Sequence, residues 1–196
     1  MTAAIIHVGL LLAALAPPDA GAPARAPGDG GAGASAKVSA RAEVETALGK
    51  AGGAELQRLA ATAQATLMMI ASDRSTAETL RARALSALAY ARNLRAQTYL
   101  ENFVVGRTPP LDATDRVLVR HAAVALGWQG DARLVETVAP LLDNADADVR
   151  LDAAIALGLG RTRSAEAPLR ARLATETDAA VRRQIEASLK AVTAPR

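Results

Sequence analysis

The chain repeats one pattern of apolar and polar positions, most clearly between residues 118 and 158. The phrase Ala-Ala-x-Ala-Leu-Gly ends at Gly127 and again at Gly158, 31 residues later. Weaker copies occupy residues 80–89 and 181–190, so the steps along the chain are 38, 31 and 32 residues. A period of roughly 30 to 40 residues in an alanine-rich, helix-forming sequence is typical of stacked helix pairs. The sequence therefore predicts an all-α solenoid in which each copy is the second helix of a pair.

The starts of these second helices are marked by aspartates. An Asp lies three residues ahead of the last three copies, at Asp115, Asp146 and Asp178. A carboxylate at this place accepts hydrogen bonds from the free amides of a helix start, so we expect three N-caps. Residues 127–131, a glycine-containing segment, follow a helix and not a strand, and we interpret them as a turn between helices.

Apolar residues at helical spacing predict the first helix of each pair. A short leading helix over residues 40–48 precedes them and ends at Gly49. The predicted first helices span residues 54–70, 92–105, 131–142 and 164–174, the third of them capped by Asp131.

The phrase at residues 146–158, Asp-x-x-Val-Arg-x-x-Ala-Ala-x-Ala-Leu-Gly, resembles the second helix of HEAT-like repeats of the phycobilisome-lyase type. Residues 115–127 and 178–190 match it less fully, and the resemblance extends over residues 54–192. It implies about four antiparallel helix pairs, stacked as a right-handed superhelix with the second helices on the concave side. It also implies a scaffold that binds other macromolecules.

The N-terminal region has a different composition. Residues 3–16 are apolar, and no charged residue occurs before Asp19. A helix of this length measures about 21 Å, shorter than a hydrocarbon core of about 30 Å. We expect residues 1–24 to be a signal peptide and the protein to be exported to the periplasm or secreted. The alternatives are an uncleaved membrane anchor and a cytoplasmic N-terminal tail.

The Pro-, Gly- and Ala-rich segment that follows lacks large apolar residues, which predicts a flexible linker over residues 25–37. The repeat domain then occupies residues 38–196.

Composition narrows the possible functions. The formal charge is only +3, and the basic residues are interleaved with 20 acidic ones, which disfavours nucleic acid as the partner. The absence of cysteine excludes disulfides and thiol catalysis. No phosphate-binding loop, zinc-protease motif or nucleophile elbow occurs. We therefore predict no catalytic residue, cofactor or metal site. His121 and Asp152 lie one repeat apart and could act together as a general base, but a solvated pair is the favoured interpretation.

The variable positions of the repeat are not needed for stacking and are the candidate partner-binding face. They mix charge with aliphatic side chains, which suits a protein partner better than a phosphate backbone. For Leu151 and Ile155 the alternative is simple contact with the neighbouring pair. The candidate residues are Arg83, Arg120, His121, Val124, Leu151, Asp152, Ile155, Arg183 and Gln184.

The leading hypothesis is a non-enzymatic HEAT-repeat scaffold that mediates protein–protein interaction in a bacterial cell envelope. A membrane contact is expected only through the N-terminal segment. The resemblance leaves two alternatives, a HEAT-like nucleic-acid-binding or base-repair module and an accessory lyase-like subunit. The residues available for a nucleic-acid-binding or base-repair module are Arg83, Arg120, Arg183, Trp128 and Asp152.

Overall fold

The computed structural model describes residues 30–107, 109–130 and 133–194, with side chains from residue 36 onward. All regular secondary structure in these residues is helical, with ten α-helices and two 3-10 segments, which confirms the all-α prediction. Asp131 and the expected signal segment, residues 1–24, lie outside the described residues. None of the helices within them is long and apolar enough to cross a membrane.

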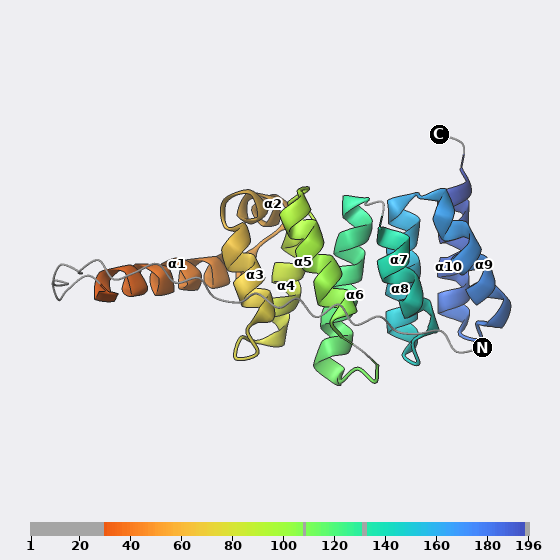
Figure 1. Cartoon of the computed structure of the whole chain (residues 1–196), viewed down its shortest axis with the longest axis horizontal. Coiled ribbons are helices and arrows are strands. Elements are labelled where there is room, and N and C mark those ends of the chain that lie inside the picture. Colours follow the sequence, from red (N-terminus) through yellow and green to blue (C-terminus); the bar gives the residue numbers. More distant parts are fainter. Residues whose placement is uncertain (1–29, 108, 131–132, 195–196) are drawn as a thin grey trace, which may run out of the picture.

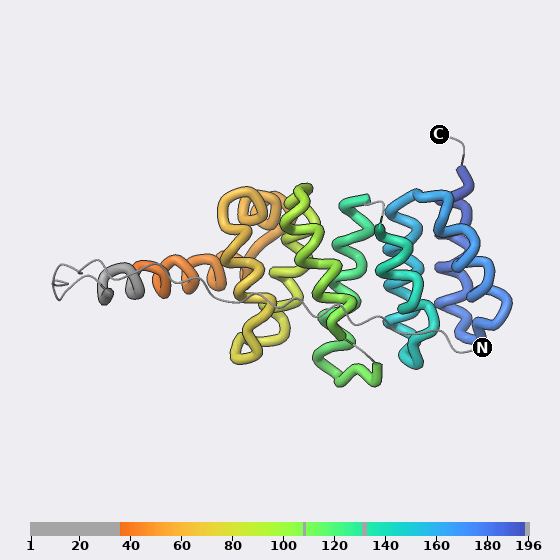
Figure 2. Tube along the Cα trace, viewed as in Figure 1, coloured from red at the N-terminus to blue at the C-terminus, as the bar shows by residue number. Residues whose placement is uncertain are grey.

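The helices form a leading element and four consecutive pairs. Figure 1 shows α3 to α10 side by side along the long axis of the molecule, and Figure 2 traces the chain from one pair to the next. The pairs are α3 with α4, α5 with α6, α7 with α8, and α9 with α10; the second helices α4, α6, α8 and α10 pack on one another in that order. The bounds are α1 (Gly30–Lys50), α2 (Gly53–Thr62), α3 (Gln64–Ser72), α4 (Glu78–Leu88), α5 (Leu94–Val105), α6 (Ala113–Gln129), α7 (Leu134–Val138), α8 (Ala147–Gly160), α9 (Glu166–Thr175) and α10 (Ala179–Thr193), with 3-10 segments at Ala139–Asp143 and Arg163–Ala165.

The small residues of the repeat lie at the contacts between second helices. Ala122, Ala123 and Leu126 are fully buried, as are their counterparts in α8. The glycine that closes the pattern also lies at a helix contact. A β-carbon on Gly127 would overlap the backbone of Ala156 in α8, so the absence of a side chain lets the two helices approach closely.

Two of the three predicted N-caps are confirmed. The carboxylate of Asp146 accepts hydrogen bonds from the amides of Asp148 and Val149, and Asp178 does the same at the start of α10. The third prediction is wrong. Helix α6 begins a turn earlier than expected, and Asp112 caps it by accepting from the amide of Asp115 at 2.7 Å.

The carboxylate of Asp115 is used elsewhere, since it accepts a 2.9 Å hydrogen bond from Nε of Arg107. Asp112 is the first carboxylate after the prolines at 109 and 110, which cannot donate within a helix, and it therefore takes the capping place.

The first helices depart further from prediction. The helix expected over residues 54–70 is broken at Ala63, whose φ of −132° and ψ of 26° are not helical. As a result α2 turns away from the direction of α3 (Figure 1). The first helix of the third pair, α7, ends at Val138, and the chain continues as a 3-10 segment with Pro140 in its first turn. Proline lacks the amide that an α-helix interior requires.

The leading helix is longer than the predicted residues 40–48. It begins at Gly30, so the described part of the predicted linker, residues 30–37, is helical. Alanine-rich sequence extends a helix readily once one end is held. That end is held by the fully buried Leu48 and by Arg41, which donates to Asp73 and Thr76 in the turn after α3, while the N-terminal part of α1 extends beyond the stack (Figure 1).

Candidate functional site

A hollow of about 720 Å³ opens on the second helices of the first three pairs. Helix α2 forms one wall, and α4, α6, α8 and the turn after α4 supply the remainder. We call this site the hollow. It is lined by Leu56, Gln57, Ser86, Ala89, Tyr90, Arg92, Arg120, His121, Val124, Ala125, Trp128, Asp152 and Ile155.

Two exposed aromatic side chains, Tyr90 and Trp128, line the hollow. Trp128 is 57% exposed and Tyr90 is 47% exposed. Aromatic rings of this size are highly buried on average, so two of them open to solvent in one hollow are unusual. Leu56, Val124 and Ile155, all half-buried, complete the apolar lining.

The repeat itself brings the two aromatics together. Tyr90 follows Leu88 by two residues, and Trp128 follows Leu126 by two, so they occupy equivalent places of the repeat, Tyr90 just after the end of α4 and Trp128 in the last turn of α6. Because α4 packs directly on α6, equivalent places lie next to each other across the contact.

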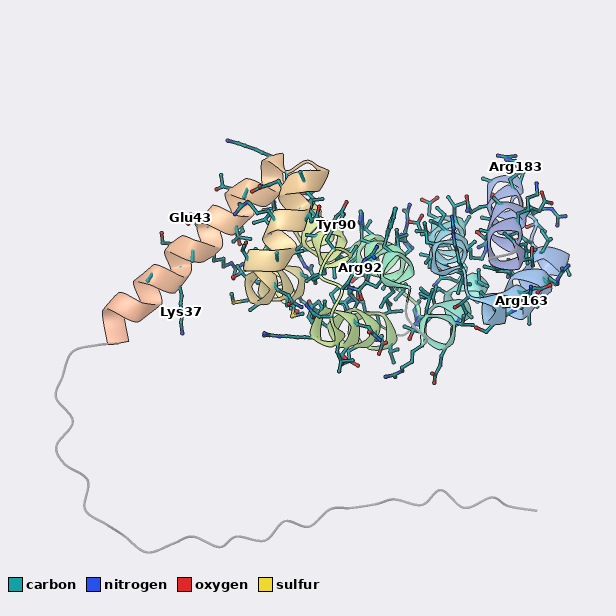
Figure 3. All side chains as sticks on the ribbon, turned by 90° about the horizontal axis from the view of Figure 1, so that it is seen from above. Lys37, Glu43, Tyr90, Arg92, Arg163 and Arg183 are labelled. Carbon is teal, nitrogen blue, oxygen red and sulfur yellow. The ribbon has the colours of Figure 1, made fainter. Side chains whose placement is uncertain are left out.

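Hydrogen bonds fix the turn that carries Tyr90 and Arg92. From α6, Nε2 of Gln129 donates to the carbonyl oxygen of Leu88 at 2.8 Å and to that of Ala91 at 3.4 Å. On the other side of the turn, the amides of Asn93 and Gln64 exchange two hydrogen bonds of 3.0 and 3.2 Å. The turn is thus attached to both α6 and α3. Figure 3 shows Tyr90 and Arg92 next to each other, far from Arg163 and Arg183 at the other end of the stack.

The polar floor of the hollow is an ion-pair group. Nε of Arg120 donates to Oδ2 of Asp152 at 2.7 Å, and its Nη1 lies 3.1 Å from Oδ2 of Asp148. The carboxylate of Asp152 is therefore bonded to Arg120. The general-base pair of His121 and Asp152 considered from sequence is not the arrangement found.

The imidazole of His121 bonds instead to the preceding repeat, with Nδ1 2.9 Å from Oγ of Ser86 in α4. Loss of hydration in the hollow lowers the pKa of His121, and the positive charge of Arg120 lowers it further, against an opposing effect of Asp152. His121 is consequently neutral near pH 7.

Nucleophilic catalysis by Ser86 would require a group that orients the imidazole, and Asp152 is occupied by Arg120. Within the described residues, no group of three or more potential metal ligands is found. The arrangement is suited to binding.

Five of the nine predicted residues meet in the hollow: Arg120, His121, Val124, Asp152 and Ile155. Of the other four, Leu151 packs against the core, as its alternative interpretation had it, and Arg183 is exposed on α10 at the far end of the stack (Figure 3). Gln184 donates to Oγ of Ser188 at 3.2 Å.

Arg83 has a structural contact in place of the predicted one. Its Nε donates to the carbonyl oxygen of Leu48 at 2.5 Å, and its Nη2 donates to that of Ala51. Both carbonyl oxygens lie at the C-terminal end of α1, where a positive charge interacts favourably with the helix dipole. Arg83 therefore anchors the leading helix, because α1 packs on α4 where a preceding repeat would otherwise stack.

The predicted partner-binding face omitted Tyr90, Arg92 and Trp128 because they follow the repeat pattern; Trp128 was named only for the nucleic-acid alternative. A signal was present, since an aromatic residue occurs two positions after the pattern leucine in two copies, 38 residues apart. Leu56 and Gln57 had no such signal. They reach the hollow because α2 is turned by the break at Ala63.

Comparison with known proteins agrees with the geometry. The family model for HEAT repeats matches residues 108–190. Among solved structures, the complex of CpcE and CpcF of phycocyanin lyase from Nostoc sp. PCC7120 is similar, with a TM-score of 0.53 and 19% sequence identity over 77% of this chain and 98% of that one. The comparison with curated proteins found no match. The inferred resemblance is confirmed: residues 108–190 match the HEAT-repeat model, and the chain has the fold of a HEAT-like α-solenoid.

Proposed function

We propose that this protein is a non-enzymatic scaffold that binds a protein partner through the hollow. The observation that carries the proposal is the exposure of Trp128 and Tyr90 within a concave site whose rim is fixed by hydrogen bonds. Tryptophan, tyrosine and arginine are the residues that most often dominate protein–protein binding energy, and they do so within polar surroundings. The hollow has this composition.

The polar side chains of the hollow support binding over catalysis. Arg120, Asp152, Ser86 and His121 are bonded to one another across three successive second helices. Bonds between repeats stiffen the surface on which the aromatics stand, which lowers the entropy lost on binding. The similar phycocyanin lyase structure is itself a complex of two proteins, which is consistent with a scaffold role.

The nucleic-acid alternative receives less support. Of its candidate cations, Arg83 is bonded to carbonyl oxygens at the end of α1, and Arg120 is paired with two aspartates. Phosphate-backbone binding needs several available cations along one surface. The alternative of an accessory lyase-like subunit is supported by the similarity of fold to the phycocyanin lyase complex.

We also propose that the protein acts in the cell envelope after export. The support is the apolar run at residues 3–16, which is shorter than a membrane span. N-terminal sequencing of the mature protein from fractionated cells tests this location. An unprocessed chain in the cytoplasm would contradict it.

Site-specific photocrosslinking in the native cell tests the scaffold function. Trp128 is replaced by photoreactive benzoylphenylalanine, and the control carries the same group at Arg163, an exposed site outside the hollow. We expect a protein adduct of defined mass at position 128 only, and its loss when Ile155→Arg is added. Identical adducts at both positions, or an adduct indifferent to Ile155→Arg, would contradict binding through the hollow.

A further inference from the structure

We infer that the segment bound in the hollow is an apolar stretch of a partner polypeptide that carries a carboxylate, and that this carboxylate pairs with Arg92. The inference rests on the proposed function and adds the chemistry of the partner. It is argued from the charges that line the hollow and from the fixed position of the turn after α4.

The charged side chains of the hollow are not equally available. Arg120 and Asp152, which both line the hollow, neutralise each other at 2.7 Å; Asp148, the second carboxylate on Arg120, is not among the lining residues. Arg92 is exposed, and among the described residues its side chain has no ion pair or hydrogen bond. The available charge of the hollow is therefore one guanidinium, which binds a carboxylate with two parallel hydrogen bonds.

The surroundings of Arg92 specify the remainder of the ligand. Tyr90 lies two residues away on the same fixed turn, and Trp128 and Leu56 line the same hollow. A volume of about 720 Å³ accommodates several side chains, and its lining is largely aliphatic and aromatic. A ligand that fills it therefore presents apolar groups with one anionic group at the edge.

A polyanion fits this arrangement less well. Nucleic-acid grooves follow the backbone with a series of cations as well as stacking aromatics. Here a single available cation lies beside the aromatics. A polypeptide with isolated acidic residues matches that charge pattern, whereas a phosphate backbone does not.

The position of Arg92 is set before binding. Gln129 holds the carbonyl oxygens of Leu88 and Ala91, and Asn93 is bonded to Gln64. Because the backbone on both sides of Arg92 is attached, only the side chain must be ordered when a carboxylate binds.

The test uses three synthetic peptides of leucine, alanine and serine that differ at one central position, which is glutamate, glutamine or lysine. Trp128 is the only tryptophan in the chain, so its fluorescence reports occupancy of the hollow directly. We expect the glutamate peptide to bind about five-fold more tightly than the glutamine peptide, and the lysine peptide more weakly than either. Arg92→Gln should abolish the preference, and Arg92→Lys should retain most of it.

The matched control is Arg95→Gln, at an exposed arginine outside the hollow, which should leave the preference unchanged. Equal binding of the glutamate and glutamine peptides, a preference that survives Arg92→Gln, or no binding by any peptide would overturn the inference. Quenching of Trp128 by a single-stranded oligonucleotide, without any response to the peptides, would overturn it in favour of nucleic acid.

Failure of the inference is separable from failure of the scaffold function. A crosslinked partner at position 128 that is indifferent to Arg92→Gln leaves the scaffold function in place and removes the carboxylate. A preference for the glutamate peptide that depends on Arg92, without any crosslinked protein at position 128, keeps the carboxylate inference and removes the scaffold function.

Discussion

A β-carbon on Gly127 would lie 2.5 Å from the carbonyl oxygen of Ala156, so the separation of α6 and α8 requires glycine at this place. At the equivalent Gly158, a β-carbon would meet the side chain of Ser188 at 2.6 Å. The repeated glycine thus makes the same kind of contact twice. In the first case the neighbour is backbone, and in the second it is the buried Ser188, whose β-carbon would lie 2.9 Å away and whose α-carbon 3.1 Å away.

We expect Gly127→Ala to lower the free energy of unfolding by roughly 2 kcal/mol. The strain of overpacking exceeds the gain of about 1 kcal/mol that alanine brings to a helix. Gly158→Ala should be destabilising as well, because rotation of the Ser188 hydroxyl does not move its β-carbon, which would lie 2.9 Å away. Urea unfolding measures both effects. Gly49→Ala is the control, because nothing lies within 4 Å of its β-carbon, and it should be neutral or stabilising. Equal stability of Gly127→Ala and the wild type would show that glycine does not set the helix separation.

A second prediction concerns the buried ion pair of Arg150 and Glu176, which is bidentate with bonds of 2.8 and 2.9 Å. The side chain of Glu176 is 0% exposed. The Arg150 guanidinium holds the pKa of Glu176 well below its ordinary value of 4.5. The unfolded chain therefore takes up this proton at a higher pH than the folded chain does. Stability from the pair is complete above about pH 4.5 and is lost progressively as the pH falls below it.

Glu176→Gln should lower the free energy of unfolding at pH 7 by about 3 kcal/mol, because Arg150 is left buried without its partner. Urea unfolding between pH 7 and pH 3 should show a shallower acid loss in this variant than in the wild type. Glu43→Gln, at an exposed glutamate, is the control and should follow the wild type. Parallel acid curves for wild type and Glu176→Gln would contradict this assignment.

A third prediction concerns His121, whose pKa lies below its ordinary value of 6.5. The folded state binds this proton less readily than the unfolded state, so stability from neutral His121 is complete above about pH 6.5 and falls as the solution is acidified. Asp152→Asn should lower the pKa of His121 further, because the carboxylate opposes the shift. Proton NMR titration of the imidazole measures this, and His121→Gln distinguishes its signal from that of His7, the other histidine. An unchanged or raised pKa in Asp152→Asn would refute it.

A fourth prediction concerns the turn after α4. Gln129→Met keeps the side-chain volume but removes the donor to Leu88 and Ala91, and it should cost about 1 to 2 kcal/mol of stability. Hydrogen exchange of the amides in residues 88–93 should accelerate more than that of α8. The matched control is Gln57→Met, at an exposed glutamine of the hollow, with an expected change within about 0.5 kcal/mol. Unchanged exchange in the turn would show that Gln129 does not hold it.

The fold was largely predictable because its cause is local and repeated. Alanine at fixed places in the pattern allows close packing of helices, and Asp146 and Asp178 mark helix starts in the way any exposed helix requires. One error arose where two residues could serve one role. Asp112 and Asp115 are both suited to cap α6; Asp112 does so, and the carboxylate of Asp115 pairs with Arg107.

The site was predictable only in part, for a related reason. Arg120, His121, Val124, Asp152 and Ile155 come from two adjacent regular repeats, where equivalent positions share one face. Arg83 occupies an equivalent position but meets α1, an element outside the repeat. Sequence periodicity describes the contacts between like units and carries no information on what packs at their ends.

The break at Ala63 has a further consequence. Because α2 turns away from α3 and walls the hollow, the leading half of the solenoid offers a concave site, whereas α8 and α10 continue without a comparable wall in the described residues. The two ends of the solenoid therefore differ as binding surfaces. Under the proposed scaffold function, we therefore expect a partner seated between α2 and Trp128 to bind in one orientation along the solenoid.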